Sequence, residues 1–150
     1  MPVPVVQSPS RDFWPALSPD GRWLAVCDKN ANLAFWDTGS RRPVFSLKMW
    51  GHLNPFAFSK TGDLLAYAAA GSQAVSVVEL KSRQEIVRLP QANNIAQVAF
   101  SADATRLFAF SETGRLVEWD LASKQALRTF EFIPRSFDGR NTVAFSANGN

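Results

Sequence analysis

Short apolar runs alternate with polar turns along this chain in a layout that repeats. The first copy spans residues 16–37. It contains a Ser-Pro-Asp-Gly turn at 18–21, an apolar run at 23–27, a second polar turn and a third run that ends in Trp36-Asp37. Proline presets φ at such a turn, and Asp and Gly accept the bend. The same layout returns twice, and a fourth copy begins at residue 142.

The spacing of the copies predicts the fold. The serines at the equivalent turns are Ser18, Ser59, Ser101 and Ser146, in steps of 41, 42 and 45 residues. Each copy holds four short runs of strand-forming residues, and four strands per period of about 40–45 residues are typical of a β-propeller blade. We therefore predict an all-β protein of four-stranded antiparallel sheets. About three blades plus one strand make up an incomplete propeller.

The blades are predicted at about 13–47, 54–89 and 95–130, with the start of a fourth at 142–150. An extended, proline-rich segment at 1–12 precedes them. The second strand of each blade, at 23–27, 64–68 and 107–110, is a continuous apolar run. Such runs are typical of strands that are buried on both faces, as when blades stack face to face. The fourth strand is mixed in polarity, which suits an outer edge.

The turns and strand ends resemble those of the WD-repeat family. The matching features are Ser-Pro-Asp-Gly at 18–21, the Trp-Asp dipeptides at 36–37 and 119–120, and Gly51-His52 ahead of the second copy. The resemblance covers residues 13–150, and its most specific feature is the spacing across three repeats. A neighbouring family of periplasmic propellers shares the Ser-Pro-Asp-Gly turn but lacks Trp-Asp, so the two dipeptides favour the WD-repeat family.

The resemblance implies mainly structural roles for the repeat positions. The best repeats of the family hold a Trp–Ser–His–Asp hydrogen-bond network. Here blade three offers only Trp119 and Ser111, and Val78-Glu79 replaces Trp-Asp in blade two. We therefore expect apolar packing to dominate, with the large aromatic side chains in the core. The positions to which structural roles are assigned are Asp20, Gly21, Trp36, Asp37, Ser111, Trp119 and Asp120.

The chain offers few residues for catalysis. It has one histidine, His52, and one cysteine, Cys27, and it contains no phosphate-binding glycine loop and no metal-ligand spacing. We predict that it is not an enzyme and uses no metal and no cofactor. Cys27 lies within an apolar run and is expected to be an inert, buried thiol. A single cysteine, no signal peptide after Met1 and no apolar run of ~20 residues together predict a cytoplasmic protein without a membrane span.

Protein binding is the predicted function. The net charge of +3 is scattered rather than clustered, which makes nucleic acid an unlikely partner. In propellers, the connections between blades and the turns between second and third strands share one rim. Aromatic and arginine residues in loops are enriched at binding hot spots. The candidate partner-binding residues on this rim are Trp50, His52, Phe132, Arg135 and Phe137. The competing interpretation is that one or two of these aromatics fill the gap between blades.

The number of blades leaves two interpretations of the assembly. Propellers of this kind have four to eight blades, and three blades with one extra strand leave an unpaired edge. The remaining blades are therefore expected from the rest of a longer chain or from self-association of copies of this one. The predicted function is a scaffold for protein–protein interaction. The alternative is a sensor or docking region of a larger multidomain protein.

Overall fold

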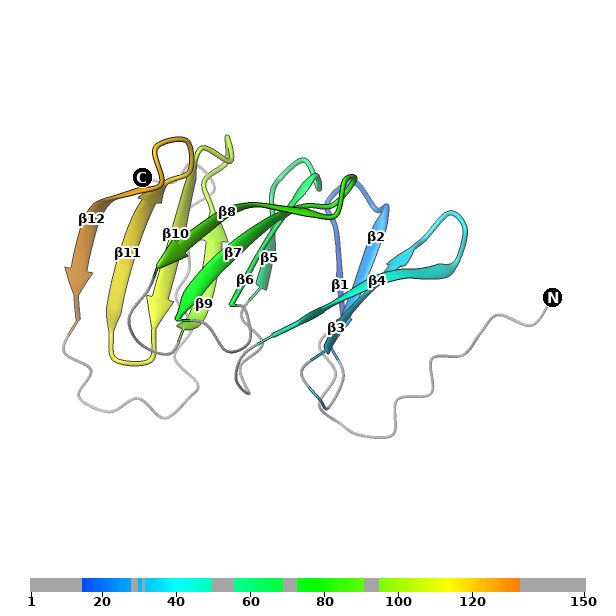
Figure 1. Cartoon of the computed structure of the whole chain (residues 1–150), viewed down its shortest axis with the longest axis horizontal. Helices are drawn as coiled ribbons and strands as arrows, with labels where there is room; N and C mark the ends of the chain where they lie inside the picture. The colour runs from blue at the N-terminus through cyan, green and yellow to red at the C-terminus, as the bar shows by residue number, and fades with distance from the viewer. Residues whose placement is uncertain are drawn as a thin grey trace.

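The computed structural model describes residues 15–27, 30, 32–49, 56–68, 73–90 and 95–132. Over these ranges, twelve strands form three antiparallel sheets of four strands each. The three sheets stand side by side in a row, in chain order (Figure 1). The predicted all-β fold of four-stranded propeller blades is therefore confirmed. The predicted extended segment at 1–12 and the fourth repeat at 142–150 lie outside the described residues.

Within each sheet the strands pair in sequence order. The second strands match the predicted ranges within one residue. Blade one contains β1 (Pro15–Leu17), β2 (Trp23–Cys27), β3 (Asn32–Asp37) and β4 (Arg42–Lys48). Blade two contains β5 (Phe56–Phe58), β6 (Leu64–Ala68), β7 (Ala74–Glu79) and β8 (Gln84–Pro90). Blade three contains β9 (Ile95–Phe100), β10 (Arg106–Ser111), β11 (Arg115–Asp120) and β12 (Gln125–Glu131).

The three sheets repeat one another in register as well as in order. The pairing of the third and fourth strands shifts at the same place in each blade, after Phe35, Val77 and Glu118. A bulge inserts one residue and bends the strand that carries it. Because the shift recurs at equivalent residues, each position in one blade has a defined counterpart in the other two.

Two apolar clusters join the blades face to face. The first brings Trp23 and Phe35 of blade one against Leu65 and Val78 of blade two. The second is built from aliphatic residues of β6, β7 and β8 and from β9, β10 and β11, with Trp119 among them. Blade two thus contributes one face to each cluster. Burial of apolar surface between the sheets, at about 25 cal/mol per Å², supplies the main stabilising term.

The expectation that every second strand is buried on both faces is wrong for blade one. In β6 and β10 nearly every residue is buried, whereas β2 alternates, and its Leu24 and Val26 are only half-buried. Leu24 and Val26 lie on the face of blade one that points away from blade two, where no described strand packs against them (Figure 1). Position in the row alone does not decide burial, since β10 is buried although blade three also has a described sheet on one face only.

Candidate interaction site

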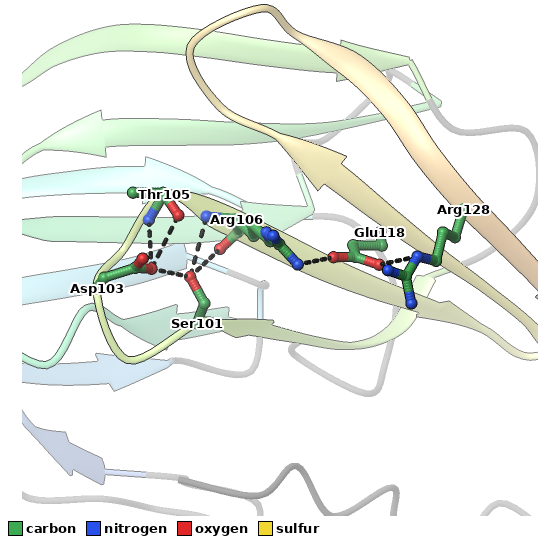
Figure 2. Close-up of polar contacts among 6 residues, drawn as sticks. All are labelled: Ser101, Asp103, Thr105, Arg106, Glu118 and Arg128. Carbon is green, nitrogen blue, oxygen red and sulfur yellow. Dashed lines mark hydrogen bonds and ion pairs between the residues drawn. The ribbon is translucent and has the colours of Figure 1, made fainter. Parts of the chain in front are cut away.

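In blades one and three, the turn between the first and second strands is held by a serine and an aspartate two residues apart, whereas blade two has Ser59 and Thr61 at these places. In blade three, Asp103 accepts hydrogen bonds from the Ser101 hydroxyl at 2.6 Å and from the Thr105 amide and hydroxyl at 3.1 and 2.9 Å (Figure 2). These donors, Ser101 first, lower the pKa of Asp103 to about 2. The carboxylate is therefore engaged by its own turn and serves the fold.

Blade one repeats this turn with Ser18 and Asp20. The Ser18 hydroxyl donates to Asp20 and accepts from the Trp23 amide at 2.9 Å. The bond from Ser18 is the largest cause that lowers the pKa of Asp20. Gly21 follows with φ of +73°, a left-handed conformation that glycine adopts without steric cost. Asp20 and Gly21 thus shape the turn.

The aspartates of the two Trp-Asp dipeptides close the turns between third and fourth strands. Asp37 accepts the Ser40 amide at 2.7 Å, and Asp120 accepts both the amide and the hydroxyl of Ser123 at 2.7 Å. In each case the backbone bond is the largest cause that lowers the pKa of the carboxyl group. Both side chains are therefore turn caps at the ends of β3 and β11.

The two tryptophans occupy equivalent positions but different surroundings. Trp119 is 8% exposed and lies in the cluster between blades two and three. Trp36 is half-buried on the face of blade one that points away from blade two. The structure thus buries one of the two predicted core tryptophans, because only Trp119 has a described blade in front of it.

Ser111 closes the turn between β10 and β11. It is fully buried, its hydroxyl lies 2.9 Å from that of Thr113, and it accepts the Arg115 amide at 3.0 Å. Its hydroxyl thus holds this turn, while its backbone pairs with Ile95 of β9.

Phe132 is the one predicted rim residue that the structure describes. It follows β12, its side chain is 54% exposed, and its ring meets Phe110 edge-on at 6.3 Å. Its amide donates to the Gly114 carbonyl at 2.7 Å, which ties it to the neighbouring turn. The other four candidates, Trp50, His52, Arg135 and Phe137, lie outside the described residues.

A second polar group on blade three was not predicted from the sequence. Glu118, in the middle of β11, is only 4% exposed in its side chain and receives Arg106 at 2.7 Å and Arg128 at 3.6 Å. Figure 2 shows the carboxylate between the two guanidinium groups. The sequence does contain a signal for this group, because Glu118 interrupts an otherwise apolar run at 116–119. A carboxylate buried at such a position requires charged or hydrogen-bonding partners.

The described residues hold neither a group of metal-ligating side chains nor a membrane-spanning helix. Over the ranges given above, no three His, Cys, Asp or Glu side chains are grouped so that they could hold a metal ion. Over the same ranges, no helix is long and apolar enough to cross a membrane.

Known proteins resemble this chain in sequence and in fold. No family model matches the chain. The WD repeat-containing protein 91 homolog of Dictyostelium discoideum is 26% identical over 100 residues, which are 65% of this chain and 13% of that protein. This chain therefore spans a small part of that relative.

Two solved structures share the fold. Hydrazine synthase of Kuenenia stuttgartiensis superposes with a TM-score of 0.65 at 18% identity, over 83% of this chain and 37% of that one. U3-55K superposes with a TM-score of 0.67 at 17% identity, over 83% of this chain and 41% of that one. Likeness at this identity concerns the fold alone. The sequence similarity, the repeat spacing and the three stacked four-stranded sheets support a β-propeller of the WD-repeat type for the described part of the chain.

Proposed function

We propose that this chain is a non-enzymatic scaffold for protein–protein interaction. The observation that carries the proposal is Phe132, a large aromatic side chain that stands 54% exposed at the end of β12. Aromatic residues supply much of the energy at protein interfaces because they bury a large area with few rotatable bonds. Phe132 lies on the rim for which the sequence predicts partner binding.

The surroundings of Phe132 favour binding because they hold it in place. Its amide is bonded to Gly114 at 2.7 Å, and its ring rests against the buried ring of Phe110. An anchor that is already ordered loses less conformational entropy when a partner arrives. The similarity to a WD repeat-containing protein supports the same proposal, since proteins of this kind generally bind protein partners. We further propose a cytoplasmic location, on the basis of the single, buried Cys27.

The proposal is tested by capture of cross-linked partners on the tagged chain, with identification by mass spectrometry. Phe132→Ala is expected to lose the partners that the wild type captures, while its circular dichroism and unfolding midpoint stay unchanged. The matched control is Leu127→Ala, since Leu127 is 48% exposed on β12, the strand that Phe132 follows, but lies away from the rim. Equal capture by wild type and Phe132→Ala would overturn the proposal.

The residues outside the described ranges require a separate variant. Trp50→Ala combined with Phe137→Ala removes two of the aromatics that the sequence assigns to this rim. If they belong to the binding surface, the double variant loses the same partners as Phe132→Ala and retains its fold. If they fill the gap between blades, the unfolding midpoint falls instead.

A further inference from the structure

The turn between third and fourth strands carries a basic residue in a left-handed backbone conformation in every blade. Arg41, Arg83 and Lys124 occupy this position, with φ angles of 57°, 61° and 59°. A positive φ is sterically unfavourable for a residue with a side chain, whereas glycine adopts it without that cost. The left-handed positions in the turns between first and second strands are uncharged: Gly21, Gly62 and Ala104. The turns before the fourth strands thus place a cation where glycine is the least strained residue.

The geometry of these turns does not require the positive charge. The amides of Arg41 and Arg83 donate to the carbonyls of Asp37 and Glu79, each at 2.8 Å, so backbone bonds close the turns. All three cations are exposed, and none forms an ion pair or a side-chain hydrogen bond with another described residue. Arg83 rests over the Phe45 ring at 5.8 Å, which leaves its N–H donors unused. The fold therefore uses the backbone of these residues and leaves their charged groups open to a ligand.

The fold also gathers cations that are scattered along the sequence. The turns β3–β4, β7–β8 and β11–β12 lie on one side of the row of sheets (Figure 1). Three more exposed cations lie in or beside turns of this side: Arg42, Lys60 and Lys81. The acidic residues of the same turns are Asp20, Asp37, Asp63, Glu79, Asp103 and Asp120. Asp20, Asp37, Asp103 and Asp120 accept hydrogen bonds from their own turns. Most of the carboxylates are thus used within the fold, whereas the cations are not.

The spacing of the three left-handed cations indicates an extended acidic peptide as the ligand. Stacked sheets lie about 10 Å apart, and an extended chain advances about 3.3–3.6 Å per residue. Carboxylates about three residues apart therefore reach neighbouring turns, and a run of about seven residues or more reaches all three. A nucleic acid strand carries a phosphate about every 3.4 Å, which is much denser than one cation per blade. The acidic residues of these turns also oppose a ligand of such high charge density.

We propose that the turns between third and fourth strands bind an extended acidic segment of a partner protein through Arg41, Arg83 and Lys124. Backbone strain that recurs at equivalent positions, without a need in the fold, is typical of functional sites. These turns lie on the rim opposite to that of Phe132, so either proposal can fail without the other.

Replacement by glycine separates binding from folding. Arg41→Gly, Arg83→Gly and Lys124→Gly, combined in one chain, remove the three charges and the unfavourable φ at the same time. The affinity for a fluorescein-labelled decaglutamate peptide, measured by fluorescence anisotropy at low salt, is expected to fall about fivefold or more. The midpoint of urea unfolding is expected to stay or to rise, because glycine adopts this φ without steric cost. A structural role of the three cations predicts a lower midpoint instead.

Two controls fix the interpretation. Exchange of the cations for one another, as Arg41→Lys, Arg83→Lys and Lys124→Arg, keeps the charges and should keep the affinity within about twofold. Arg88→Gln removes an exposed cation from the middle of β8 and should leave the affinity unchanged, whereas Arg83→Gly alone weakens binding.

Four results would overturn the proposal. They are no binding of decaglutamate by the wild type, equal affinity of the triple glycine variant, and a fall of its unfolding midpoint together with its affinity. The fourth is tighter binding of a ten-nucleotide oligothymidylate or of phosphatidylserine vesicles than of decaglutamate, lost in the triple glycine variant. That result would assign the three cations to a nucleic acid or to a membrane surface.

Discussion

Glu118 shows how a single residue can depart from its repeat without breaking the sheet. Its counterparts Phe35 and Val77 are buried and apolar, and it is buried as well. A buried carboxylate is costly unless it is paired, and here Arg106 provides a short, charge-assisted hydrogen bond of 2.7 Å. The sequence marks Glu118 as unusual within its run. It does not identify the partners, since these come from strands twelve residues before it and ten residues after it.

The two arginines are expected to differ in their contribution to stability. Arg106→Gln weakens the short bond and leaves Glu118 buried with a poorer partner, so it should lower the free energy of unfolding by about 1–3 kcal/mol. Arg128→Gln removes a contact of 3.6 Å from a largely exposed side chain and should cost under about 1 kcal/mol. Urea unfolding of both variants measures the difference. An equal or reversed order would contradict the proposed role of Arg106.

Asp103 makes the turn before β10 sensitive to acid. Its pKa of about 2 in the folded chain lies below the ordinary value of 3.8. It therefore stabilises the fold above about pH 4, and this contribution is lost as the pH falls towards 2. Ser101→Ala removes the largest cause of the shift and should raise the pKa of Asp103 towards its ordinary value. Titration of the carboxyl carbon by NMR measures this, and an unchanged pKa would show that Ser101 is not its main partner.

At the level of elements, strands and turns follow closely from the sequence. The repeat period predicts each second strand within one residue, because polar turns interrupt the apolar runs at constant spacing. The serine–aspartate turns are likewise visible as short motifs. What cannot be predicted is which strand faces are covered. That depends on the neighbours in space, as the half-buried Leu24 and Trp36 of blade one demonstrate.

Two turn glycines provide a comparison within one type of turn. Gly21 and Gly62 both have a positive φ, but a Cβ on Gly21 would meet nothing within 4 Å. A Cβ on Gly62 would lie 2.6 Å from Asp20 Oδ1 in the adjacent blade. Gly21→Ala should cost about 1–2 kcal/mol from backbone strain alone. Gly62→Ala should cost about 1 kcal/mol more, because it displaces Asp20 from Ser18. Equal costs in urea unfolding would argue against contact between these turns.

Equivalent leucines in the second strands test how the blades cover one another. Leu65 and Leu107 are fully buried, whereas Leu24 is half-buried. Leu65→Ala and Leu107→Ala should each lower the free energy of unfolding by about 2–5 kcal/mol. Leu24→Ala should cost roughly 1 kcal/mol, since less apolar area is lost. Similar losses at all three positions would mean that the outer face of blade one is covered in solution.

At the level of the whole molecule, the row of blades and its fold class could be predicted from the repeat alone. Of the five rim residues predicted to bind a partner, the structure describes Phe132 and shows it exposed. The charged group of Arg106, Glu118 and Arg128 on blade three could not have been foreseen from the sequence. It stands out only when equivalent positions of the three blades are compared, because blades one and two have apolar residues there. The scaffold proposal therefore depends on what differs between the repeats, while the fold depends on what they share.

Hydrogen–deuterium exchange across the whole chain tests the central claim, that three propeller blades stack in a row with blade two between the others. Amides of β6 and β7 should exchange most slowly, because their sheet is covered on both faces. Amides of β2 and β3 should exchange at least about tenfold faster, since only one face of blade one packs against another described sheet. Equal protection of blades one and two, or rapid exchange throughout blade two, would contradict the stacked arrangement.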